Sequence, residues 1–157
     1  MGPRQLFDRF QLVVRDYDLD GFADLFAEDG VIEYPFAPPG SPRRLVGRDE
    51  IRRVLAPAGR RAREAGRRIS GFRSVVLHET ADPEVIVVEF EMHVETPGSG
   101  RTHRLPYVHV IRVRNGEIVE LRDYLDALAL AEVTGQHSML TDRQAETGAT
   151  FERRRSS

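Results

Sequence analysis

A hairpin near the end of the chain constrains the fold more than any other feature. Residues 107–126 read as two strands that meet at Asn115-Gly116, where both residues can take the positive φ angles of a type I′ turn. Side chains two apart share one face of a strand, so Val119, Leu121 and Asp123 are predicted on one side of the second strand. The hairpin therefore predicts one acidic side chain in an apolar row, where an unpaired charge is costly to bury.

The length and composition indicate one globular domain with no strong overall electrostatic field. The chain has 157 residues, is 40% hydrophobic and 31% charged, and carries a net charge of -2, which attracts neither nucleic acid nor an anionic membrane. The absence of cysteine removes disulfides and thiolate chemistry. No apolar run of about 20 residues predicts a membrane segment. We expect a cytoplasmic protein with a domain over residues 1–134 and a polar, flexible tail over residues 135–157.

Hydrophobic periodicity predicts helices first and long antiparallel strands afterwards. The expected helices are residues 3–17, a short helix that carries Phe22, Leu25 and Phe26 and ends at the turn of residues 28–30, a third that starts at Gly47 and breaks near Pro57, and a last one over residues 125–132. The expected strands are residues 31–36, 72–78, 84–96, 102–114 and 117–124. This order predicts an α+β fold with the helices on one face of a curved sheet.

Two stretches between these elements allow two interpretations each. The proline-rich loop of residues 38–42 is either the lip of a cavity or a plain connector. The basic run of residues 60–68 could meet a phosphate or a carboxylate-bearing substrate. We favour a solvated surface for this run, because no aromatic residue is interleaved with the arginines.

The hairpin also predicts the neighbours of Asp123. If Val119, Leu121 and Asp123 face the pocket, the first hairpin strand should present His109 and Tyr107 on the same side, because Arg112 and Arg114 favour water. The other residues expected on that face of the first hairpin strand are Val113, Ile111 and Leu105. An imidazole beside a partly desolvated carboxylate can pass a proton, and Tyr34 could hold a substrate oxygen. The candidate catalytic residues are therefore Asp123, His109, Tyr34 and Tyr107.

The rest of the predicted pocket wall is apolar and aromatic, which suits a flat hydrophobic ligand with a few oxygens. The expected wall residues are Phe10, Val14, Ile32, Phe36, Val88, Phe90, Met92, Leu105, Leu121 and Leu125. The histidine spacings match no zinc motif, so we expect no metal and no cofactor. The competing interpretation is that Asp123 is structural, accepting hydrogen bonds from the backbone or from Tyr107 and capping the last helix.

Four stretches of the chain resemble the nuclear transport factor 2-like superfamily and, within it, the SnoaL-like proteins. They are Asp20-Gly-Phe-Ala-Asp-Leu-Phe-Ala-Glu-Asp29, Val46-Gly-Arg-Asp-Glu-Ile51, Asn115-Gly-Glu-Ile-Val119 and Arg122-Asp-Tyr-Leu-Asp126, within a resemblance that spans roughly residues 3–132. The resemblance implies a cone-shaped, curved antiparallel or mixed sheet wrapped around the N-terminal helices, with a deep apolar pocket. It also implies a homodimer formed through the outer face of the sheet.

The reaction is less clearly indicated, because three branches of the superfamily are matched only in part. The tyrosine and two aspartates of the ketosteroid isomerase pattern fall on Phe10, Tyr34 and Val108 of this chain. Limonene epoxide hydrolase has an acid that matches Asp123, while its arginine and second aspartate fall on Phe90 and Met92.

The phenazine-biosynthesis A/B proteins resemble the chain from Leu77 to Glu84 and on to Asp126. Their catalytic glutamate also matches Asp123, while their helix histidine falls near Val54. Asp123 is thus the one position that both of these branches share with this chain.

Residues and resemblance together suggest a cofactor-free general acid/base enzyme. It would be a cyclase or isomerase acting on a hydrophobic, oxygen-bearing metabolite, such as a polyketide-like intermediate of secondary metabolism. Epoxide hydrolysis and dehydration are the alternative reactions. The expected partner is a small hydrophobic molecule, not nucleic acid or a membrane. The second hypothesis is a protein that sequesters such a ligand unchanged, and the third is a structural or partner-binding domain.

Overall fold

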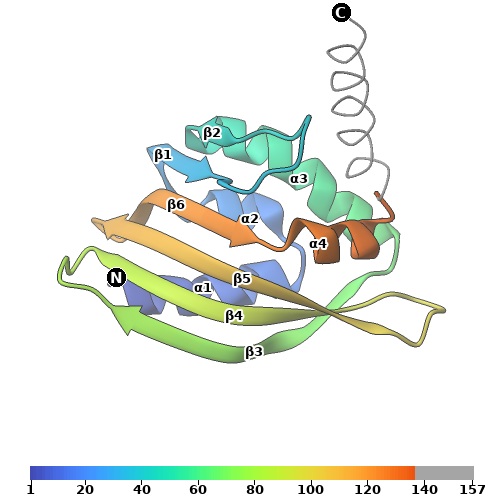
Figure 1. Ribbon diagram of the computed structural model, residues 1–157. Coiled ribbons are helices and arrows are strands. Elements are labelled where there is room, and N and C mark those ends of the chain that lie inside the picture. The colour runs from blue at the N-terminus through green and yellow to red at the C-terminus, as the bar shows by residue number, and fades with distance from the viewer. Residues whose placement is uncertain (137–157) are drawn as a thin grey trace, which may run out of the picture.

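Six strands form one curved sheet in the order β2-β1-β6-β5-β4-β3 (Figure 1). This computed structural model describes residues 1–136. The helices are α1 (Pro3–Arg15), α2 (Leu19–Ala23), α3 (Arg48–Glu64) and α4 (Ala127–Thr134), and the strands are β1 (Phe26–Glu33), β2 (Arg44–Val46), β3 (Arg68–Glu79), β4 (Val85–Glu95), β5 (Thr102–Arg114) and β6 (Glu117–Leu125). The sheet is mixed, because β1 runs parallel to β6 while the other neighbours are antiparallel. The predicted α+β fold is confirmed.

The core lies between α1 and the strands that face it. Helix α1 buries Leu6, Phe7 and Phe10 on one side. The rings of Phe7 and Phe10 lie 5.5 and 6.0 Å from the ring of Phe90 on β4. Burial of side chains of this size contributes roughly 1.5–3 kcal/mol each. This packing holds α1 against the curved sheet, as Figure 1 shows.

The predicted hairpin forms between β5 and β6. Asn115 and Gly116 have φ angles of 53° and 80°, as a type I′ turn requires. The register shifts near the turn, because Arg112 pairs with Glu120 while the next residue, Val113, pairs with Ile118. Ile118 is therefore buried where Val119 was expected, and the prediction for Val119 was wrong.

The first strand begins earlier than the sequence predicts. Phe26 already pairs with Ile118 of β6, and α2 ends at Ala23, so the short helix does not reach Phe26. The expected turn at residues 28–30 is a register shift inside β1. Gly30 allows this close approach, because an added Cβ would lie 2.8 Å from the carbonyl oxygen of Ile118.

Helix α3 continues through Pro57, where a break was predicted. The proline removes one helical hydrogen bond, at a typical cost of about 3 kcal/mol. Packing outweighs this loss: α3 buries Ile51, Ala56 and Ala62, and its Gly59 sits so close to the α1–α2 connection that an added Cβ would lie 2.6 Å from the carbonyl oxygen of Tyr17.

The last helix starts at Ala127 rather than at residue 125, because Asp126 is its N-cap. The Asp126 carboxylate accepts hydrogen bonds from the backbone nitrogens of Leu128 and Ala129, each at 3.0 Å. Asp123 therefore does not cap this helix.

Two further predictions concern the membrane and the tail. No helix within residues 1–136 is both long enough and apolar enough to cross a bilayer. Nearly all of the predicted flexible tail, residues 137–157, lies outside the described residues.

Candidate functional site

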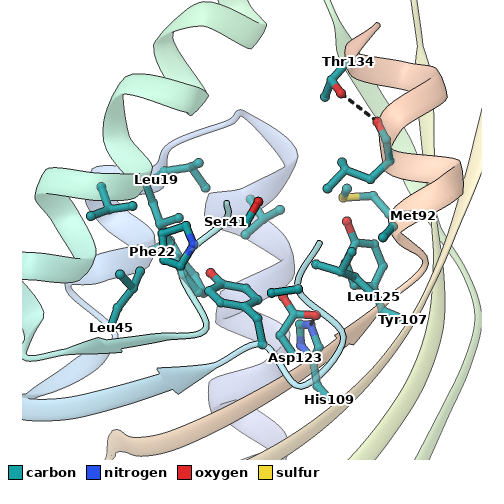
Figure 2. Close-up of a pocket in the computed structure, with 18 of the residues that line it drawn as sticks. Leu19, Phe22, Ser41, Leu45, Met92, Tyr107, His109, Asp123, Leu125 and Thr134 are labelled. Carbon is teal, nitrogen blue, oxygen red and sulfur yellow. Dashed lines mark hydrogen bonds and ion pairs between the residues drawn. The ribbon is translucent and has the colours of Figure 1, made fainter. Parts of the chain in front are cut away.

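A cavity of about 400 Å³ lies between the sheet and the helices, which is large enough for a small organic ligand. All four helices and strands β2 to β6 contribute side chains to its wall. Figure 2 shows Leu19, Phe22 and Leu45 on one side, Met92, Tyr107 and Leu125 on the other, and Asp123 beside His109 at the floor. The wall is mostly aliphatic and aromatic, so an apolar ligand body fits it.

Half of the ten expected wall residues line this cavity: Phe10, Val14, Phe90, Met92 and Leu125. Four others are buried in the core but do not line it: Ile32, Val88, Leu105 and Leu121.

Phe36 lies elsewhere, 65% exposed, with its ring 5.4 Å from that of Tyr124. The reason is local. β1 ends at Glu33, and the nitrogen of Ala37 then donates to the carbonyl of Tyr34 in a turn, so the two-residue alternation does not extend to Phe36.

Several lining residues were not among those expected. Those before α4 are Tyr17, Leu19, Phe22, Ala37, Leu45 and Ile69, with Val54 and Leu55 on the inward face of α3. Helix α4 and the residues after it add Ala127, Leu130, Ala131, Thr134 and Gln136. Helical periodicity had placed Val54 and Leu55 inward, which is the signal that could have identified them. Pro38, Ser41 and Pro42 also line the cavity, which favours the lip interpretation of the proline-rich loop.

Asp123 and His109 face each other across the hairpin. They form a register pair of β6 and β5, with His109 Nε2 and Asp123 Oδ1 3.3 Å apart. The His109 side chain is 3% exposed and that of Asp123 is 15% exposed. These two atoms, and His109 Nδ1, form no hydrogen bond within residues 1–136. The structure brings together the two groups that were expected on one face, at ion-pair distance, and the register shift near the turn makes this pairing possible.

Aromatic rings enclose the imidazole. The ring centres of Phe10, Phe90 and Tyr107 lie 5.3, 4.9 and 5.6 Å from that of His109. A buried polar atom without a hydrogen-bond partner costs about 1–3 kcal/mol, and native proteins contain few of them. The facing atoms of the pair therefore keep their capacity to form hydrogen bonds with a partner that enters the cavity.

Two phenols accompany the carboxylate. Burial raises the pKa of Tyr34 and that of Tyr107 well above the ordinary value, and the negative charge of Asp123 raises both further. Both side chains are therefore protonated at neutral pH. Neither hydroxyl donates a hydrogen bond to another group within residues 1–136, so each can donate to a ligand oxygen.

The chemistry available at the floor of the cavity is proton transfer. Asp123 is the one carboxylate and His109 the one imidazole among the described lining residues. A carboxylate can take a proton from a ligand while protonated phenols hold the oxygen that gains charge. Within residues 1–136 no three metal-ligating side chains gather at one place.

Comparison with known proteins gives the family of this chain. Residues 4–121 match the SnoaL-like domain. An uncharacterized PhzA/B-like protein of Pseudomonas aeruginosa is 31% identical over 137 residues, which are 86% of this chain and 92% of that protein.

Solved structures agree with this assignment. A candidate isomerase from Bacillus subtilis superimposes with a TM-score of 0.71 at 27% identity, over 84% of this chain and 91% of that one. A candidate polyketide cyclase from Pseudomonas putida, at 19% identity over 84% of this chain and 97% of that one, shares the fold with a TM-score of 0.60. The chain therefore belongs to the SnoaL-like family, with the nuclear transport factor 2-like fold.

Proposed function

We propose that the protein is a general acid/base enzyme, a cyclase or isomerase, for a hydrophobic ligand with a polarisable oxygen. The observation that carries the proposal is the Asp123–His109 contact, buried and short of hydrogen bonds, at the floor of an apolar cavity. The similarity to a candidate isomerase supports the same reaction class.

The reaction begins with the transfer of one proton. Asp123 takes a proton from a carbon next to the carbonyl group of the ligand. The electrons of the broken C–H bond form a carbon–carbon double bond, and the carbonyl oxygen gains the negative charge. Tyr34 and Tyr107 donate hydrogen bonds to this oxygen, which stabilises the enolate in a site of low polarity.

The second step returns the proton and closes the cycle. If the protonated Asp123 delivers it to a different carbon, the product is an isomer. If the enolate carbon instead attacks a second carbonyl of the same ligand, a ring closes and the new alkoxide takes the proton. His109 lies close enough to exchange this proton with Asp123, which makes it a relay between turnovers.

Deuterium exchange tests the first step without knowledge of the natural substrate. The probe is 2-tetralone, a flat apolar ketone, incubated with the protein in D₂O while its mass is followed. We expect the wild type to speed exchange and Asp123→Asn to reduce the catalysed rate by on the order of 10²-fold or more, since a base contributes about 10²–10⁴-fold.

The matched control is Glu120→Gln, which removes a negative charge from the same strand but from a residue outside the cavity. Its rate should equal that of the wild type. Equal exchange by the wild type and Asp123→Asn would rule out the assigned role of Asp123.

One observation favours a second candidate function, the binding of a ligand without reaction. The arginine and second aspartate used by limonene epoxide hydrolase correspond to Phe90 and Met92, and both side chains line the cavity as apolar wall. A ligand recovered chemically unchanged after tight binding, as measured by mass spectrometry, would support this function. A catalysed change in any bound ligand would exclude it.

A further inference from the structure

The two oxygens of the Asp123 carboxylate have different surroundings. Oδ1 is buried and lies 3.3 Å from His109 Nε2. In Figure 2 one carboxylate oxygen of Asp123 lies next to the His109 ring and the other is turned away from it. Oδ2 forms no hydrogen bond with another group within residues 1–136, and it is not closed off as Oδ1 is. Because Asp123 lines the cavity, Oδ2 is the oxygen that a ligand can reach.

A phenol stands on each side of this carboxylate. Strand β6 lies between β1 and β5 in the sheet, and the last register pair of β1 and β6 is Glu33 with Arg122. Tyr34 and Asp123 follow these two residues, so they lie level with each other, and both line the cavity. Tyr107 lines the cavity from β5, on the other side of β6. The carboxylate is therefore flanked by two hydroxyl groups that can donate to a ligand.

These groups can attack a carbon atom as well as remove a proton. Aspartate is an effective nucleophile in enzymes when its carboxylate is held against a carbon centre, and Oδ2 has lone pairs that no described group occupies. Attack on carbon requires that the departing oxygen is stabilised as it gains negative charge. An epoxide suits the flanking phenols, because its strained ring opens readily and the departing oxygen stays attached to the ligand between them.

We propose that this cavity has a second activity, the hydrolysis of a hydrophobic epoxide through a covalent ester of Asp123. Oδ2 forms a bond to one epoxide carbon, while the bond between that carbon and the epoxide oxygen breaks. The departing oxygen takes a proton from Tyr34 or Tyr107, which leaves a phenolate. This step produces a hydroxyalkyl ester of Asp123. The activity uses the cavity of the proposed function but a different reaction, so each can be tested separately.

Water completes the reaction. It adds to the carbonyl carbon of the ester, while the imidazole of His109, whose Nε2 lies 3.3 Å from Oδ1, takes one of the water protons. The tetrahedral intermediate then expels the ligand oxygen, which receives this proton from His109, and the ligand leaves as a diol. Asp123 is released as the acid and returns its proton to the phenolate. The sum of the steps is one epoxide and one water giving one diol.

A single turnover in water labelled with oxygen-18 tests the covalent step. Wild-type protein is mixed in excess with styrene oxide, an apolar epoxide, and the diol is analysed by mass spectrometry. We expect an unlabelled diol, whose second oxygen comes from Asp123, and we expect the label in the proteolytic peptide that contains Asp123. A diol that carries the label would show direct attack by water and overturn the inference. Diol formation no faster than without protein would overturn it as well.

The variant His109→Gln tests the second step. The ester should still form, but its hydrolysis should slow by on the order of 10²-fold or more without the imidazole. The intact protein should therefore gain the mass of one styrene oxide molecule, located on Asp123 by peptide sequencing. A folded variant that forms diol at the wild-type rate would remove His109 from the reaction. If circular dichroism shows that the variant is unfolded, the single turnover of the wild type decides.

Two further variants control these experiments. Asp123→Asn should form diol only at the rate seen without protein. Glu120→Gln removes a carboxylate from the same strand but from outside the cavity, and it should keep the wild-type rate. A labelled diol together with normal exchange of 2-tetralone would overturn this inference and leave the proposed function intact. If the ester forms but 2-tetralone does not exchange, the proposed function fails and the epoxide reaction stands.

Discussion

Two groups of charged side chains in this molecule differ in how completely their hydrogen bonds are satisfied. At the end of the β3–β4 hairpin, Arg112 donates to Asp82 at 2.7 Å, and Arg114 donates to both oxygens of Glu84 at 3.0 and 2.8 Å. All four side chains are partly exposed. In the cavity, the Asp123–His109 pair is more deeply buried and its facing atoms form no hydrogen bond within residues 1–136.

We infer from this difference that the first group is structural and the second is a candidate functional site. In the hairpin cluster each charge has a partner of opposite sign, as in an ordinary exposed ion-pair network. The Asp123–His109 pair is more deeply buried than the hairpin cluster and makes fewer hydrogen bonds. Burying polar groups in this way lowers the stability of the fold. A group retained at such a cost is a candidate for function, because pKa-tuned and underbonded groups concentrate at active sites.

The largest effect that we expect from altering either group is on the exchange rate, when a cavity phenol is removed. Tyr34→Phe and Tyr107→Phe each remove one donor to the ligand oxygen. We expect a fall on the order of 10²-fold in the 2-tetralone exchange rate for the donor that contacts the oxygen. Tyr124→Phe, which alters the tyrosine that packs against Phe36, is the matched control and should exchange at the wild-type rate. Wild-type rates in both cavity variants would remove the phenols from the mechanism.

The next effect is on stability. Replacing both members of the cavity pair with leucine, as Asp123→Leu with His109→Leu, removes the underbonded polar atoms and keeps an apolar core. Urea unfolding should show a gain of about 1–4 kcal/mol, as for other buried pairs replaced by apolar residues. A loss of stability in this double variant would show that the pair holds the fold together.

The hairpin cluster should respond in the opposite way. Glu84→Gln weakens both arginine contacts, so we expect a small fall in melting temperature that shrinks at high salt, where exposed ion pairs are screened. The exchange rate on 2-tetralone should not change. If the exchange rate fell while the protein stayed folded, the hairpin cluster would have a role in the reaction, contrary to our proposal.

The smallest effect is on pH dependence. Hydrogen bonds from Arg112 and Arg114 lower the pKa of Asp82 and that of Glu84 below their ordinary values of 3.8 and 4.5. A lowered folded-state pKa contributes stability above the ordinary value and loses it as the pH falls through the lowered one. The double variant Asp82→Asn with Glu84→Gln should therefore lose less stability than the wild type between about pH 5 and pH 2, measured by urea unfolding. An identical loss in both proteins would contradict this.

Much of the fold and the core of the candidate site could be predicted from local rules. The Asn115-Gly116 turn could be predicted from its two residues. The pairing of His109 with Asp123 also needs the extra residue in β6, because an unbroken two-residue hairpin would place Val108 opposite Asp123. The alternation of apolar and polar side chains along β4 likewise predicted that Phe90 and Met92 share one face, and both line the cavity.

The failures occur where packing overrides local preference. Pro57 stays within α3 because the buried helix face outweighs one lost hydrogen bond. Val119 is displaced by Ile118 because an extra residue in β6 shifts the register, which no sequence period shows. Gly59 and the backbone of Tyr17 are brought together only by the docking of α3 on the α1–α2 connection, which the sequence of either element alone does not reveal.

The most direct test of the central claim is to measure exchange rate and unfolding free energy on the same preparation of Asp123→Asn. Our account predicts that catalysed exchange into 2-tetralone falls by on the order of 10²-fold or more, while the unfolding free energy changes little, because asparagine keeps the shape of the side chain and the facing Asp123 and His109 atoms have no hydrogen bond to lose. Undiminished exchange together with a loss of several kcal/mol would contradict the account, since Asp123 would then serve the fold and not the reaction.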